Sequence, residues 1–203
     1  MVLFVDILTN QLIVMAIAFI TLAYGLIKTY RVHSTVTDYR NSMKAQYIPL
    51  LTLGGLMAIT GLYGLMTWPL PGSYNILFYD LYPVLGLGLI GIAVSIKNDY
   101  KLEHLGFMAI LFGLVTIYYG VIGFMHHMTL EPAALLALYA LTGLASIFFY
   151  PVSLFLDSAK YGKIFLIIDA ILLILAGIVA AYIGIAAVPE HLVGFSKWVP
   201  PIL

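Results

Sequence analysis

The sequence predicts an all-α, polytopic membrane protein: a compact bundle of six transmembrane helices with both termini outside. Hydrophobic residues make up 63% of the 203 residues and charged residues only 9%, whereas about a quarter of a soluble domain is charged. The mean hydropathy is +1.07. Six segments are long and apolar enough to span, and basic residues concentrate in alternate connections. The expected surroundings of this chain are therefore a lipid bilayer.

Each spanning helix needs roughly 20 apolar residues. The first span, 8–29, follows no basic stretch and precedes no small-residue cleavage site, which favours a retained helix over a signal peptide. The other spans are expected at 46–68, 76–96, 103–125, 132–153 and 163–187. Because the connections are too short to fold alone, residues 1–203 are expected to form a single domain.

Charge predicts the orientation of the bundle. The connections after the first, third and fifth spans carry eight of the nine basic residues: Lys28, Arg31, Arg40, Lys44, Lys97, Lys101, Lys160 and Lys163. The opposite side carries only Lys197. The positive-inside rule therefore places both termini outside, in the plasma membrane. The balance of 9 basic and 9 acidic residues excludes nucleic acid as an expected partner.

The connection between the second and third spans reads TWPLPGSYNILFYDLYP. Pro69 to Gly72 are expected to end the second span and turn the chain. Asn75 is a candidate N-cap for a third helix that begins at Ile76. On that register Asp80 lies roughly 6 Å inside the helix.

An acid inside a membrane helix is costly and indicates function by default. Pro83 has no N–H to donate to the carbonyl of Tyr79, which leaves an acceptor free beside Asp80. A cation, a water or a hydroxyl could bind there. The residues Asn75, Tyr79, Asp80 and Glu131 are therefore the candidate binding site of the outer face. Alternatively, Pro83 occupies a tolerant first turn and Asp80 completes an interfacial cap.

A second acid lies deeper. Asp169 follows Lys163 by about 9 Å of helix, too far to be an N-cap. It is expected to need a partner, such as a tyrosine hydroxyl or a snorkelling base like Lys97 or Arg31. Both a buried structural pair and a proton or ion relay are open interpretations.

Metal-capable side chains gather on the predicted outer face as His126, His127 and Glu131. His127 and Glu131 are spaced i, i+4. However, Glu131 precedes Pro132 and should avoid helical geometry, so it is expected to cap a helix that starts at Pro132. The spacing then fails to place both side chains on one helical face. No pattern identifies a cofactor, and the chain has no cysteine.

Small residues form a stripe along the fourth span at spacings of three and four: Gly106, Ala109, Gly113, Thr116, Gly120 and Gly123. Such stripes let membrane helices approach closely, which predicts a packing seam. By contrast, the GxGxxG match at 86–91 lies inside a span, where the backbone amides are already bonded, and is accidental. The loops TDYRN (37–41) and NDYKL (98–102) hint at an internal repeat, although interfacial tyrosine and lysine are common in any membrane protein.

The run TWPLPGSYNILFYD, with glycine-rich spans on either side, resembles an uncharacterised family of short multi-pass membrane proteins. That family, a domain of unknown function, occurs in archaea and some bacteria. The resemblance covers most of the chain, and Trp68 to Pro71 and Asn75 to Asp80 carry it. It implies a membrane protein and supplies no activity.

Two functions follow as hypotheses. In the first, the protein carries or binds an ion or small molecule in a pocket open to the outer face, with Asp169 deeper on the path. This predicts a polar cavity from Asp80 toward Asp169. In the second, the chain is a non-catalytic subunit of a larger membrane complex, such as a respiratory complex, or a homo-oligomer. Its glycine seams would then face partner helices. A metal-dependent membrane enzyme is the third hypothesis.

Overall fold

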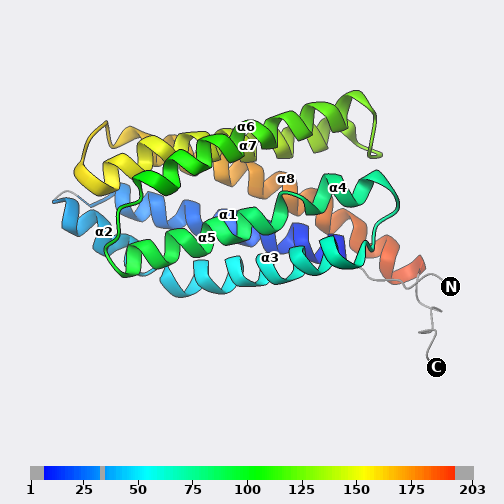
Figure 1. Ribbon diagram of the computed structural model, residues 1–203, viewed down its shortest axis with the longest axis horizontal. Coiled ribbons are helices and arrows are strands. Elements are labelled where there is room, and N and C mark those ends of the chain that lie inside the picture. Colours follow the sequence, from blue (N-terminus) through cyan, green and yellow to red (C-terminus); the bar gives the residue numbers. More distant parts are fainter. Residues whose placement is uncertain (1–6, 33–34, 195–203) are drawn as a thin grey trace.

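The computed structural model describes residues 7–32 and 35–194, and this part of the chain contains helices and no strand (Figure 1). The helices are α1 (Ile7–Tyr30), α2 (Val36–Lys44), α3 (Tyr47–Thr67), α4 (Ser73–Tyr79), α5 (Tyr82–Lys97), α6 (Glu103–Met125), α7 (Pro132–Ser158) and α8 (Ile164–Gly194). Six helical stretches, with α4 and α5 taken together, are long and apolar enough to cross a membrane. The prediction of an all-α chain with six such segments is confirmed. The helices α7 and α8 run past the predicted ends at 153 and 187.

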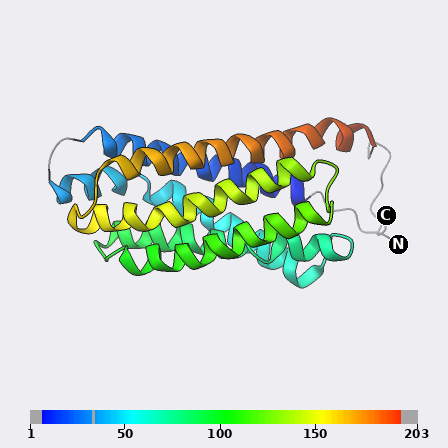
Figure 2. The same cartoon turned by 90° about the horizontal axis from the view of Figure 1, so that it is seen from above.

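The long helices pack as antiparallel pairs: α1 with α8, α3 with α5, and α6 with α7. Contacts of α7 with α8 and of α1 with α3 join the pairs into an elongated bundle (Figures 1 and 2). We call one end the α4 end, where α1 begins, α8 ends and α6 connects to α7. The other is the α2 end, where α5 connects to α6 and α7 to α8.

The third predicted span differs from expectation, because it is broken. Helix α4 begins at Ser73, after Gly72 with a φ of 54°, and stops at Tyr79. Helix α5 restarts at Tyr82 with Pro83 in its first turn. The proposed start at Ile76 is therefore wrong. Pro83 lacks an N–H and its ring disfavours a continuous helix through Asp80 and Leu81, so the chain restarts instead.

Asn75 is also not the N-cap that the sequence predicted. Gly72 holds that position, and Asn75 lies within α4, fully buried against α3. Its Nδ2 donates to the Gly64 carbonyl at 3.2 Å, and its Oδ1 accepts from the Leu70 amide at 3.3 Å. Asn75 thus satisfies backbone groups at the end of α3 and ties the connection to it.

The small-residue stripe of α6 is the seam with α7, as predicted. A Cβ at Gly113 would lie 2.4 Å from the Gly143 carbonyl oxygen, and one at Gly106 would lie 2.3 Å from Ser153 Oγ. The GxGxxG glycines lie inside α5, also as expected. Gly86 among them packs against the backbone of α3.

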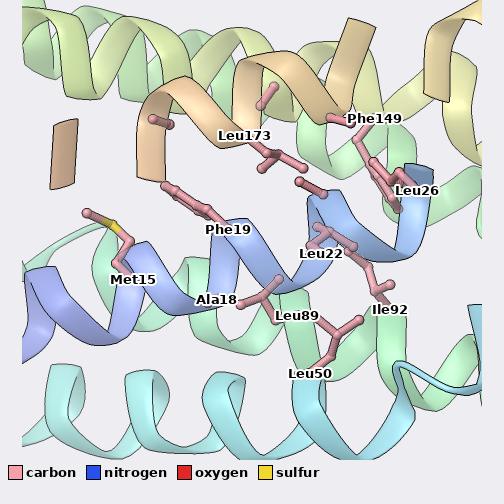
Figure 3. Close-up of a cluster of buried hydrophobic side chains, with 14 of the residues drawn as sticks. Met15, Ala18, Phe19, Leu22, Leu26, Leu50, Leu89, Ile92, Phe149 and Leu173 are labelled. Carbon is pink, nitrogen blue, oxygen red and sulfur yellow. The ribbon is translucent and has the colours of Figure 1, made fainter. Parts of the chain in front are cut away.

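The centre of the bundle is an apolar core contributed by several helices. Figure 3 shows Phe19 and Leu22 of α1 projecting into the same region as Leu173 of α8 and Phe149 of α7. All four are at most 5% exposed. These four side chains also form part of the wall of the cavity at the candidate site.

Buried charge at the α2 end joins three parts of the chain. The Nη1 of Arg40 lies 2.6 Å from Asp157 Oδ1, and both side chains are about nine-tenths buried or more. Asp157 Oδ2 accepts from the amides of Leu102 and Glu103, at 2.8 and 2.9 Å, and so caps the start of α6. Arg40 also donates to the Tyr100 carbonyl. The two loops suspected of repeating thus contact one another.

Candidate functional site

Asp169 is buried in α8 and lacks the partner that the sequence predicted. Its exposed fraction is 1%, and no hydrogen bond or ion pair joins it to the described residues. The expectation of a tyrosine hydroxyl, Lys97 or Arg31 as partner is therefore wrong. What lies beside the carboxyl instead is open space.

That space is a cavity of about 260 Å³ between α1, α5, α6, α7 and α8. Its walls are apolar except for three side chains, Thr142, Ser146 and Asp169. The Ser146 hydroxyl already donates to the Thr142 carbonyl at 2.9 Å. Asp169 is therefore the strongest hydrogen-bonding group that faces the cavity unused.

The larger cavity reaches the side of the bundle between α5 and α6. Three of its lining residues are well exposed, Val84 at 46%, Leu87 at 54% and Met108 at 63%. Helix α5 packs chiefly on α3 and helix α6 chiefly on α7, so these two neighbours in sequence leave a gap between them. Val84 and Leu87 lie in the first half of α5 and Met108 lies in the first half of α6, so the opening lies along the side of these helices.

A smaller cavity of about 50 Å³ lies toward the α4 end. Gln11 of α1, Phe78 and Tyr82 from either side of the α4–α5 break, and Thr142 of α7 are among its lining residues. It shares Leu85, Phe112 and Thr142 with the larger cavity. The two cavities are therefore neighbours with a common wall.

The arrangement can hold a largely apolar molecule that carries a polar group. An engineered apolar cavity of about 150 Å³ holds benzene, so a volume of 260 Å³ suits a body of about two fused rings. A carboxyl offers acceptor oxygens and, when protonated, a donor. A purely hydrocarbon occupant would leave Asp169 unsatisfied, at a cost of about 1–3 kcal/mol.

Comparison with known proteins gives a family and no activity. The family model described as "Protein of unknown function (DUF981)" matches residues 1–194. The chain belongs to this family. No curated protein and no solved structure matches the chain. For this DUF981 protein the resemblance noted on the sequence is thus confirmed, and function rests on the site itself.

The residues predicted for the outer face lie at the α4 end but line neither cavity. Asp80 ends α4 and accepts from the Tyr119 hydroxyl at 2.8 Å. Tyr79 is fully buried against Gly64, where a Cβ would lie 1.9 Å from its ring. Glu131 accepts from the Tyr182 hydroxyl at 3.1 Å. In the DUF981 protein these residues contact three further helices, α3, α6 and α8, rather than a common space.

The structure does not bring the predicted metal ligands together. Glu131 is the N-cap of α7 and Pro132 follows in its first turn, as predicted. His126 ends α6, and His127 has a φ of 47°. Within residues 7–32 and 35–194, no group of three or more His, Cys, Asp or Glu side chains is placed to hold a metal ion.

Sequence reasoning missed Gln11, Thr142, Arg40 and Asp157 as important residues. Gln11 and Thr142 are uncharged, so a search for ionisable groups inside apolar spans passes over them. A signal existed for Gln11, since an amide inside an apolar span must face the bundle interior. The signal for Asp157 was weaker: it is an acid near the end of a span, in a connection that otherwise carries basic residues.

Proposed function

We propose that this DUF981 protein is a multi-pass plasma-membrane protein that binds and carries a small lipid-soluble molecule. In this proposal, α1 begins and α8 ends on the outer side. The six long apolar helices support insertion, and the basic residues of the α2 end support the orientation. The lipid bilayer is then the source of the ligand.

The observation that carries the proposal is the apolar cavity with an unpartnered acid. In a bilayer, an opening between α5 and α6 faces acyl chains, so a lipid-soluble molecule can enter sideways without crossing water. Asp169 selects molecules with a hydrogen-bonding group over hydrocarbon chains. This differs from the pocket inferred from the sequence, because the opening is lateral and the walls are apolar.

The residues of the α4 end have a supporting role in this proposal. Asn75 and Tyr79 hold α4 against α3, and the Tyr119–Asp80 hydrogen bond holds the break. The alternative hypothesis, a subunit of a larger complex, expected the glycine stripe of α6 to face partner helices. That stripe contacts α7 of the same chain, so the carrier is the better-supported function.

A binding experiment with two probes tests the proposal. The protein is placed in lipid nanodiscs, and equilibrium dialysis against empty nanodiscs measures the retention of 2-naphthol and of naphthalene. We expect 2-naphthol to bind about tenfold more tightly, since one buried hydrogen bond contributes about 1 kcal/mol or more. The change Asp169→Leu should remove this preference. Binding of neither probe, or a preference that survives Asp169→Leu, would refute the proposal.

Glycine variants test the position of the opening. Gly88 lines the larger cavity, and a Cβ there would meet no atom within 4 Å, so Gly88→Phe adds a ring at the opening without a backbone clash. We expect it to reduce retention of both probes. Gly55 of α3 is equally unobstructed and lies away from the cavity, so Gly55→Phe is the matched control. Equal effects of the two variants would argue against an opening between α5 and α6.

A further inference from the structure

The smaller cavity contains hydrogen-bonding groups that the protein itself leaves unused. Gln11 is 2% exposed, and neither its Oε1 nor its Nε2 has a partner among the described residues. The Thr142 hydroxyl is likewise buried and unpartnered. Buried amides and hydroxyls are nearly always hydrogen-bonded, so three such atoms around one cavity require an explanation.

The other polar side chains of this cavity are already satisfied. The Thr116 hydroxyl donates to the Phe112 carbonyl, and the Tyr139 hydroxyl donates to the Leu77 carbonyl. The Tyr82 hydroxyl donates to the backbone carbonyl of Gln11 at 3.3 Å, which fixes α5 against α1 and leaves the amide side chain unengaged. The unused groups are thus a carboxamide, with two donors and an acceptor, and one hydroxyl.

The chemistry of the lining defines what fits. No charged side chain lines the smaller cavity, so an ion there would lose its hydration without gaining a counter-charge. An uncharged group with both a donor and an acceptor complements the Gln11 amide. The volume of about 50 Å³ admits a group of a few heavy atoms or a few water molecules.

We propose that the Gln11 cavity is a second polar subsite, which binds an uncharged donor–acceptor group such as a primary carboxamide. The group belongs to the molecule whose apolar body occupies the Asp169 cavity, and the shared wall at Leu85, Phe112 and Thr142 is where the two parts meet. This inference rests on the proposed function and narrows its ligand class. The ligand is then an apolar molecule with polar groups at both ends.

A third probe tests the subsite. 6-Hydroxy-2-naphthamide keeps the body and hydroxyl of 2-naphthol and adds a carboxamide at the far end. We expect the wild-type protein in nanodiscs to bind it about tenfold more tightly than 2-naphthol, because one or two further buried hydrogen bonds form. Gln11→Met keeps the length of the side chain and should abolish this gain, measured as the ratio of the affinities for the two probes.

The control is a second buried glutamine. Gln46 is 6% exposed, lies at the α2 end and lines neither cavity, so Gln46→Met should retain the full gain. If 2-naphthol binds but the carboxamide adds nothing, or the gain survives Gln11→Met, the cavity holds water only and the subsite is refuted while the carrier stands. If 2-naphthol itself does not bind, both proposals fall together. Thermal unfolding of each variant separates loss of binding from loss of folding.

Discussion

Two buried acids, Asp157 and Asp169, show that burial alone does not identify a functional carboxyl. Asp157 receives a hydrogen bond from Arg40 and two from backbone amides, so both of its oxygens are engaged by the protein. Asp169 is even more buried and receives none from the described residues. The first acid therefore has a structural explanation, and the second has no partner among the described residues, which the proposed ligand would supply.

Removal of the Asp157 carboxylate should destabilise the protein severely. Asp157→Ala removes the closer counter-charge of the buried Arg40, whose Nε stays 3.8 Å from the exposed Asp99, and leaves two amides of α6 uncapped. Together these losses cost about 3–5 kcal/mol. Thermal unfolding in detergent measures the change. Asp99→Asn is the control, because Asn also tolerates the φ of 57° at this position. The Asp99 carboxylate pairs with Lys44 and lies 3.8 Å from Arg40, but it is 60% exposed and should matter little. Similar losses for both variants would contradict a buried, coupled role for Asp157.

The Lys44–Asp99 pair predicts a small pH dependence. The hydrogen bond from Lys44 lowers the pKa of Asp99 against the opposing effect of desolvation, and the charges of Lys44 and Arg40 lower it by smaller amounts. A lowered pKa in the folded state contributes stability above the ordinary carboxyl range, and that contribution is lost as pH falls below about 4. Lys44→Met should therefore lower Tm at pH 7, and the two Tm values should converge as the pH falls through the lowered pKa of Asp99. A difference in Tm that stays constant with pH would exclude this origin.

At the scale of the element, the α4–α5 break shows local chemistry overriding hydrophobic pattern. Hydropathy runs evenly through 76–96, which predicts one helix. Pro83 cannot continue the hydrogen-bond ladder, and the connection places Asp80 where Tyr119 can donate to it. The break brings Phe78 and Tyr82 to one side of the smaller cavity. A single straight helix would present a different set of side chains there.

The α6–α7 seam yields a prediction about packing. Gly113→Ala forces the helices apart, because its Cβ would lie 2.4 Å from the Gly143 carbonyl oxygen. Overpacking of this kind costs about 1–3 kcal/mol. Gly88→Ala in α5 is the matched control, since nothing lies within 4 Å of its Cβ. Thermal unfolding compares the two, and a destabilisation of Gly88→Ala as large as that of Gly113→Ala would contradict the seam.

At the scale of the molecule, the sequence predicts what periodicity and composition encode and misses what depends on pairing. The six apolar segments and the α6 seam follow from spacing, and both are confirmed. The cavities do not, because they arise where α5 and α6 pack on other helices, a fact of topology that no local pattern records. Asp169 was recognisable as unusual from its depth alone. Its lack of a partner and the role of Gln11 required the tertiary arrangement.

The predicted orientation of the whole molecule can be tested by cysteine labelling. It contains no cysteine, so a single introduced cysteine reports one position without background. Leu130, in the connection of the α4 end, is 103% exposed, and Tyr100, in a connection of the α2 end, is 62% exposed. If the basic α2 end faces the cytoplasm, a membrane-impermeant maleimide added to intact cells should label Leu130→Cys and not Tyr100→Cys.

Tyr100→Cys should label only after lysis, which also shows that its thiol is accessible. The reverse pattern would place the α2 end outside, against the charge distribution. Labelling of both variants in intact cells would mean that the chain does not hold one orientation, against the charge distribution.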